Sequence, residues 1–209
     1  MIRPTTTALK ARARTLIERM TDRARWIYAL PPSETKKHLA KTLGEHGFSI
    51  RDAESEAKVT KWLSSDDGAS FVVLEKNDLD VTLVEAKGAD AAAVLGALLA
   101  KTGFFAQSAL LESAFDVATE DARKALLTLA HMVVAWDGDW GDLFLLHLAS
   151  PDPVVRHDAV TAITIAAMVA RDPGPAPELL AEAAKRETYP KLKDTIDDAL
   201  NCVAAIAPA

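Results

Sequence analysis

Apolar residues at intervals of three and four dominate the first part of the chain, which is the spacing of a helix with one apolar side. This spacing predicts a long amphipathic helix over residues 7–30, which Pro31 ends. The same reasoning predicts two shorter helices, over residues 33–43 and 52–63. The N-terminal portion is therefore expected to be largely helical.

The pattern then changes to β-branched runs at residues 70–75 and 79–85, which a short polar segment separates. Two such runs joined by a short loop predict a β-hairpin. After Gly88, breaks rich in Pro, Gly and Asp separate apolar segments, which predict a series of helices. These segments are 89–101, 104–116, 120–135, 140–149, 153–171, 176–186 and 190–205.

One stretch of this helical half resembles a known repeat. Residues 146–163 read LHLASPDPVVRHDAVTAI, and this string is similar to the start of a HEAT repeat: an Asp-Pro turn, then Val-Arg, then small apolar residues at helical spacing. Weaker copies begin 33 residues earlier, at Thr119, and 37 residues later, around Leu192-Lys193. In that family the turn Asp and the helix Arg of neighbouring repeats commonly pair, so the resemblance implies structural roles for Asp152 and Arg156.

These observations predict a mainly α fold, a HEAT-like α-helical repeat stack with an N-terminal helical segment and a small β-hairpin. The expected domains are residues 1–103, with the N-terminal helices and the hairpin, and residues 104–209, with the repeats; a single continuous domain is the alternative. A chain of 209 residues is long enough to bury a core without disulfides or metals. Short apolar helices of this kind become stable by stacking side by side.

Composition limits which cellular compartment and which kinds of partner fit this protein. Cys202 is the one cysteine, so an intramolecular disulfide is excluded and a reducing compartment fits. A secretory apolar core and a run of the ~20 apolar residues that span a bilayer are both missing, which predicts a cytoplasmic protein without a transmembrane segment.

Residues 1–47 hold ten Lys and Arg against four Asp and Glu, whereas residues 104–209 hold eight against sixteen. The acidic half repels phosphate, so nucleic-acid binding is not expected there.

A search for catalytic chemistry finds one alternative. The hairpin contains Asp80, Glu85 and Lys87, and a strand that ends in Glu-x-Lys with an upstream Asp is similar to the metal site of PD-(D/E)xK nucleases. Asp66 and Asp67 fit the usual upstream spacing better than Asp80. Glu and Lys two residues apart at the end of a strand also form solvated ion pairs. The solvated ion pair is the preferred interpretation of Glu85 and Lys87.

Other metal-ligand patterns are incomplete. Residues 137–142 place three carboxylates in a glycine-containing loop, but they lack the further ligands of an EF-hand and suit a helix cap. The five histidines form no zinc spacing, and one cysteine does not complete such a site. The expectation is therefore no catalytic residues, no metal and no cofactor.

The leading hypothesis is a non-enzymatic scaffold or adaptor that binds a basic protein or peptide through an acidic helical surface. Immunity-like and chaperone-like roles fit equally well. The rivals are the nuclease-like enzyme and attachment to nucleic acid or an anionic membrane through the basic first helix, which more simply packs on the acidic body. The candidate binding residues are Asp137, Asp139, Trp140, Asp142, His157 and Asp158.

Overall fold

The computed structural model describes residues 25–54, 58–65, 68–117, 119–136 and 138–206. Contacts within the chain divide it into two compact units, Met1–Phe105 and Ala106–Ala209. The first is called the sheet unit and the second the helical unit. Each has its own cluster of buried apolar side chains.

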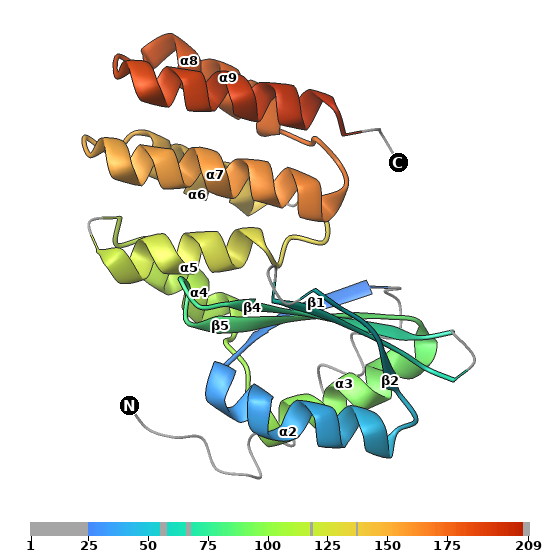
Figure 1. Cartoon of the computed structure of the whole chain (residues 1–209). Helices are drawn as coiled ribbons and strands as arrows, with labels where there is room; N and C mark the ends of the chain where they lie inside the picture. The colour runs from blue at the N-terminus through green and yellow to red at the C-terminus, as the bar shows by residue number, and fades with distance from the viewer. Residues whose placement is uncertain (1–24, 55–57, 66–67, 118, 137, 207–209) are drawn as a thin grey trace. The chain divides into compact units, whose positions relative to one another are not determined.

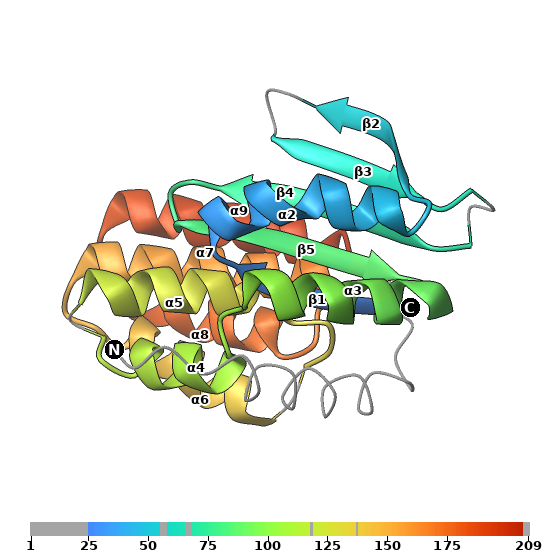
Figure 2. The same cartoon turned by 90° about the horizontal axis from the view of Figure 1, so that it is seen from below.

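The described residues of the sheet unit form a five-stranded antiparallel sheet with two helices (Figure 1). Its elements are β1 (Arg25–Leu30), α2 (Pro32–Glu45), β2 (Ser49–Glu54), β3 (Val59–Leu63), β4 (Ser70–Lys76), β5 (Val81–Lys87) and α3 (Ala89–Thr102). The strand order is β1-β5-β4-β3-β2, so the first strand in sequence lies beside the last. Figures 1 and 2 show α2 and α3 on one face of the sheet, running roughly along the strands.

A row of aromatic side chains across the sheet explains why the helices cover it. Trp26 of β1 lies opposite Ala86 of β5, Ala86 lies opposite Phe71 of β4, and Phe71 lies opposite Trp62 of β3. All four are buried in the cluster that also holds apolar residues of α2 and α3, among them Leu43. Because side chains alternate along a strand, this row places one face of β1, β5, β4 and β3 against the helices.

The predicted fold class, a mainly α repeat stack with only a small hairpin, is wrong because the sheet has five strands. The predicted helix over residues 7–30 is wrong at residues 25–30, which form β1; the rest lies outside the described residues. The predicted helix over 52–63 is wrong because this part of the chain contributes to β2 and β3. In β1 the core-facing residues alternate, Trp26, Tyr28 and Leu30, which is the period of a strand and not of a helix.

The helical unit is built of antiparallel helix pairs stacked on one another (Figure 1). Within it α4 packs on α5, α6 on α7 and α8 on α9, while α7 lies between α5 and α9. The bounds are α4 (Gln107–Ala114), α5 (Glu120–Ala130), α6 (Gly138–Leu148), α7 (Pro153–Ala170), α8 (Ala176–Arg186) and α9 (Pro190–Ala204). The helices predicted from residue 104 onward are thus confirmed as elements: α8 has the predicted bounds, α6 begins at Gly138 instead of residue 140, and the others are shorter.

The longest helix, α7, holds this unit together. Asp152 caps it by accepting a hydrogen bond from the backbone N–H of Val154 at 2.8 Å, and Pro153 occupies its first turn. Its length and composition would allow it to cross a membrane, but its apolar side is buried among the neighbouring helices. The buried residues are Val155, Ala159, Val160, Ala162, Ile163, Ala166 and Ala167.

Candidate functional site

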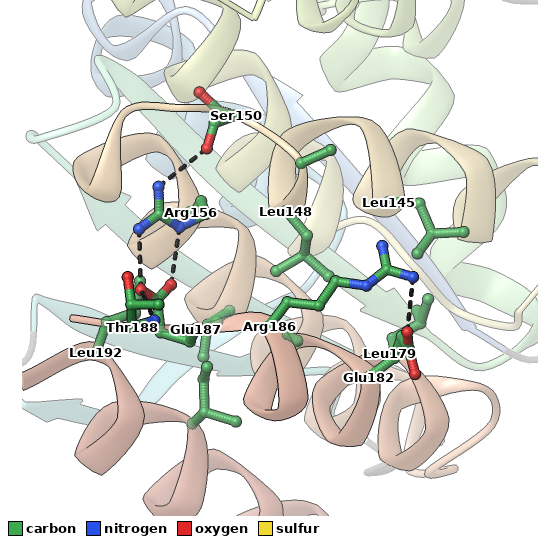
Figure 3. A pocket seen from close by; sticks show the side chains of 14 residues that line it. Leu145, Leu148, Ser150, Arg156, Leu179, Glu182, Arg186, Glu187, Thr188 and Leu192 are labelled. Atoms are coloured by element: carbon green, nitrogen blue, oxygen red, sulfur yellow. Dashed lines mark hydrogen bonds and ion pairs between the residues drawn. The ribbon is translucent and has the colours of Figure 1, made fainter. Parts of the chain in front are cut away.

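The helical unit contains a pocket of about 410 Å³ between α6, α7, α8 and α9, shown in Figure 3. This volume lies within the range of small ligand pockets. The pocket is called the α6–α8 groove. Its lining is Leu145, Leu148, Ala149, Ser150, Arg156, Val160, Leu179, Glu182, Ala183, Arg186, Glu187, Thr188, Leu192 and Ile196.

The sequence of α8 creates one wall of the α6–α8 groove. Leu179, Glu182, Ala183 and Arg186 follow the spacing i, i+3, i+4, i+7, so they share one side of the helix. The side chain of Ala183 is small and leaves space that a leucine would fill. The opposite wall carries Leu145 and Leu148 of α6, and Leu145 is 42% exposed. Two helix faces with apolar side chains therefore border an open space.

The end of the α6–α8 groove is closed by an ion pair between Arg156 and Glu187. Arg156 donates from Nε to Oε2 of Glu187 at 2.8 Å and from Nη2 to Oε1 at 2.9 Å. Its Nη1 donates to the carbonyl oxygens of Ser150 and Pro151, both at 3.0 Å. This two-pronged geometry is the strong form of an arginine–carboxylate pair. The resemblance implied pairing of the helix Arg with a turn Asp, whereas the partner of Arg156 in the structure is Glu187.

Glu187 is a buried carboxylate held ionised by its neighbours. Its side chain is 3% exposed. The hydrogen bonds from Arg156 outweigh the effect of burial and, with backbone N–H groups of Thr188 and Tyr189, lower the pKa of Glu187 to about 2. The same pair raises the pKa of Arg156. Both charges are therefore fixed in place at neutral pH.

A second group of charges lies on the outer part of the α6–α8 groove. Glu182 accepts from Nη2 of Arg186 at 2.6 Å and from Nζ of Lys185 at 3.2 Å. The Glu182 side chain is 39% exposed, and those of the two cations are 74% and 71% exposed. The hydrogen bond from Lys185 and the charge of Arg186 lower the pKa of Glu182. Glu182 is thus an ionised carboxylate that solvent and a ligand can reach.

Trp140 and Asp142, two of the candidate binding residues, belong to α6 and not to a loop before it. Asp137 lies outside the described residues, and Asp139 belongs to the first turn of α6. Trp140, named as a candidate binding residue, is 3% exposed and stacks on Phe144 of its own helix with ring centroids 6.1 Å apart. Asp142 is exposed on α6. A tryptophan beside acidic residues therefore serves the core here.

The predicted residues of α7 are also engaged within the fold. Oδ2 of Asp158 accepts from Nε of Arg123 of α5 at 2.5 Å, which links neighbouring helix pairs. His157 is exposed, with Nδ1 3.5 Å from Oδ1 of Asp158. Asp152 caps the helix. Of the residues singled out in the sequence, Arg156 lines the α6–α8 groove.

The alternative metal site in the sheet unit is occupied by the protein's own cations. Glu85 accepts from Nε and Nη2 of Arg25 at 2.8 and 3.2 Å, and Nζ of Lys87 lies 2.9 Å away. Burial raises the pKa of Glu85, but the hydrogen bonds from Arg25 and Lys87 lower it overall. Asp80 is exposed in the turn before β5, and Asp66 and Asp67 lie outside the described residues. Across the described ranges no three His, Cys, Asp or Glu residues gather as metal ligands would.

The sequence reasoning missed Leu145, Glu182 and Arg186. The available signal was the amphipathic pattern of α8, in which Glu182 and Arg186 follow Leu179 at intervals of three and seven residues. Cys202 is a free, exposed cysteine.

Comparison with known proteins gives no relative for this site. No protein-family model, no curated protein and no solved structure matches the chain. The repeat resemblance of residues 104–207 stays a prediction from its motif. The function is therefore inferred from the geometry of the α6–α8 groove.

Proposed function

We propose that the helical unit is a protein-binding module that holds an amphipathic, basic helical segment of a partner protein in the α6–α8 groove. The observation that carries this proposal is the lining of the groove, in which leucines from two helices face an open space. Helix faces spaced in this way receive the apolar ridge of a third helix, with anchors at i, i+3 or i+4. Leu145 supplies exposed apolar surface at the edge of this space.

The charge of the helical unit supports a basic partner. Residues 106–209 contain eight Lys and Arg against sixteen Asp and Glu. Of the two carboxylates that line the α6–α8 groove, Glu182 is the one a partner can reach. An excess of acidic groups attracts a cationic segment and raises its rate of association. No comparable observation supports the metal-dependent alternative, because the carboxylate of Glu85 already binds two cations.

The proposal is tested with the full chain and a fluorescent probe, an amphipathic helical peptide built from leucine and lysine. Binding is followed by fluorescence anisotropy at low and at high salt. Leu145→Asp is the test variant, since Leu145 lines the groove and is 42% exposed. Leu146→Asp is the matched control, because Leu146 is 41% exposed on the same helix but is not part of the lining.

Both substitutions add one negative charge to α6. A difference in peptide binding between the two variants is therefore due to the lining of the groove. Leu145→Asp is expected to weaken binding about tenfold or more, since it places a charge on an apolar contact surface. Leu146→Asp is expected to bind like the unsubstituted protein, and high salt is expected to weaken binding to both. Equal binding by the two variants, or no binding of the probe to the unsubstituted protein, would contradict the proposed function.

A further inference from the structure

Glu182 and Arg186 together suggest how the partner is selected. We infer that Glu182 binds a lysine or arginine of the partner segment, and that this cation replaces the guanidinium of Arg186. The inference rests on the proposed function of the α6–α8 groove. It assigns a specificity-determining role to Glu182 and the role of an internal competitor to Arg186.

The two carboxylates of the α6–α8 groove, Glu187 and Glu182, differ in whether they can accept a further hydrogen bond from a partner. Glu187 accepts two hydrogen bonds from Arg156, and its Oε1 accepts two more from the backbone N–H groups of Thr188 and Tyr189. Its side chain is almost completely buried. A partner cation therefore has no access to Glu187, whose position is fixed by the fold.

Glu182 is paired in a way that a partner can exchange. Both of its cations, Lys185 and Arg186, come from the next turn of α8 and extend into solvent. Ion pairs between exposed groups three or four residues apart are weak, because water solvates both charges and the long side chains lose entropy when they are held. Replacing one such cation by a partner's cation keeps the charge of Glu182 balanced. The new ion pair becomes stronger when the partner segment excludes water from it, because the local dielectric constant falls.

Arg186 also covers part of the surface that the partner needs. It lines the α6–α8 groove, and in Figure 3 its side chain extends along the pocket toward Glu182. The aliphatic part of an arginine side chain covers apolar surface while its charged end remains in water. When the guanidinium leaves Glu182, the side chain is free to swing into solvent. The leucines behind it then become available for apolar anchors.

The exchange predicts opposite effects for the two ends of one ion pair. Using the leucine–lysine peptide, Glu182→Gln is expected to weaken binding about fivefold, the upper end of the effect of an exposed pair. Arg186→Gln is expected to strengthen binding about threefold, because the internal competitor is gone. Glu178→Gln is the matched control, since Glu178 is exposed on the same helix and is not part of the lining.

A second probe, with each lysine replaced by uncharged citrulline, isolates the role of the partner's charge. Glu182→Gln is expected to bind this probe as well as the unsubstituted protein does. Equal losses for both probes, a loss as large in Glu178→Gln, or weaker binding by Arg186→Gln would overturn the inference. If the lysine probe binds and Leu145→Asp abolishes binding while Glu182→Gln has no effect, the proposed function stands and this inference alone fails.

Discussion

The ion pair between Arg156 and Glu187 provides the sharpest test of what holds the helical unit together. Arg156 comes from α7, and Glu187 lies in the connection between α8 and α9, so the pair joins two helix pairs. The substitution Arg156→Met keeps the apolar part of the side chain and removes the charge. It leaves the buried carboxylate of Glu187 without its main partner.

The expected loss follows from the pKa of Glu187. Because this pKa falls from 4.5 to about 2 in the folded chain, the ionised carboxylate contributes about 3 kcal/mol to the free energy of unfolding at pH 7. Removing one partner of a buried ion pair typically costs about 3–5 kcal/mol, which agrees. For an m value of about 1.5 kcal/mol per M, Arg156→Met lowers the urea midpoint of the helical unit by about 2 M.

The folded and unfolded pKa values of Glu187 also determine how the free energy of unfolding depends on pH. A carboxyl whose pKa is lower in the folded state stabilises the fold above its unfolded pKa, and this contribution is lost as the pH falls. The deficit of Arg156→Met is therefore expected to be complete at pH 7 and to shrink between pH 4.5 and about 2. The double variant Arg156→Met with Glu187→Met is expected to recover part of the loss, since no buried charge is then unpaired.

Pulsed hydrogen exchange with mass spectrometry at increasing urea measures this loss on peptides from α7 and α9, apart from the sheet unit. Arg186→Gln is the control, because it removes an arginine whose side chain is 74% exposed, and its midpoint is expected to stay unchanged. A deficit of Arg156→Met below about 1 kcal/mol at pH 7 would refute the reasoning. A deficit that stays constant down to pH 3 would refute it as well.

Three further variants test other parts of the helical unit. Gly174→Ala places a Cβ against the ring of Trp136 at a backbone φ of +44°, so a loss of about 1–3 kcal/mol is expected in a thermal melt, and an unchanged Tm would contradict this. Asp152→Ala removes the cap of α7, with an expected loss of about 1 kcal/mol and faster exchange of the Val154 amide. Burial lowers the pKa of His147, whose Nε2 donates to a backbone carbonyl, so the free energy of unfolding should fall below pH 6.5, and His147→Leu should lack this dependence.

The hairpin and the helix α7 could be predicted because their signals are local. The runs at residues 70–75 and 79–85 are confirmed as β4 and β5, and their register places Lys76 opposite Val81 around the short loop. The Asp152 cap and the proline after it define the start of α7 within a few residues. Turn chemistry and capping act between neighbours in sequence, so one sequence is enough to recognise them.

The strands β1, β2 and β3 could not be predicted in the same way. Trp26 becomes part of a strand because Ala86, sixty residues later, lies opposite it. All six residues of β2 are exposed, so this edge strand lacks the alternation of apolar residues that would have identified it. Pairing across the sheet outweighs the weak local preference for helix in these segments. The hairpin alone indicated that further strands or helices must cover it, without showing which residues supply them.

The α6–α8 groove is the part of the site that depends most on packing. Leu145 and Leu179 belong to different helix pairs, 34 positions apart in the sequence, and they line one space because α7 and α9 hold α6 and α8 side by side. Glu182 and Arg186 follow Leu179 at helical spacing and flank the buried side of α8, which the sequence pattern of this helix shows. A charged residue beside an apolar helix face is neutralised inside the fold, as Glu187 is, or faces solvent, where a ligand can reach it. Glu182 belongs to the second kind, because its side chain is 39% exposed and its ion pairs in the described structure lie within its own helix.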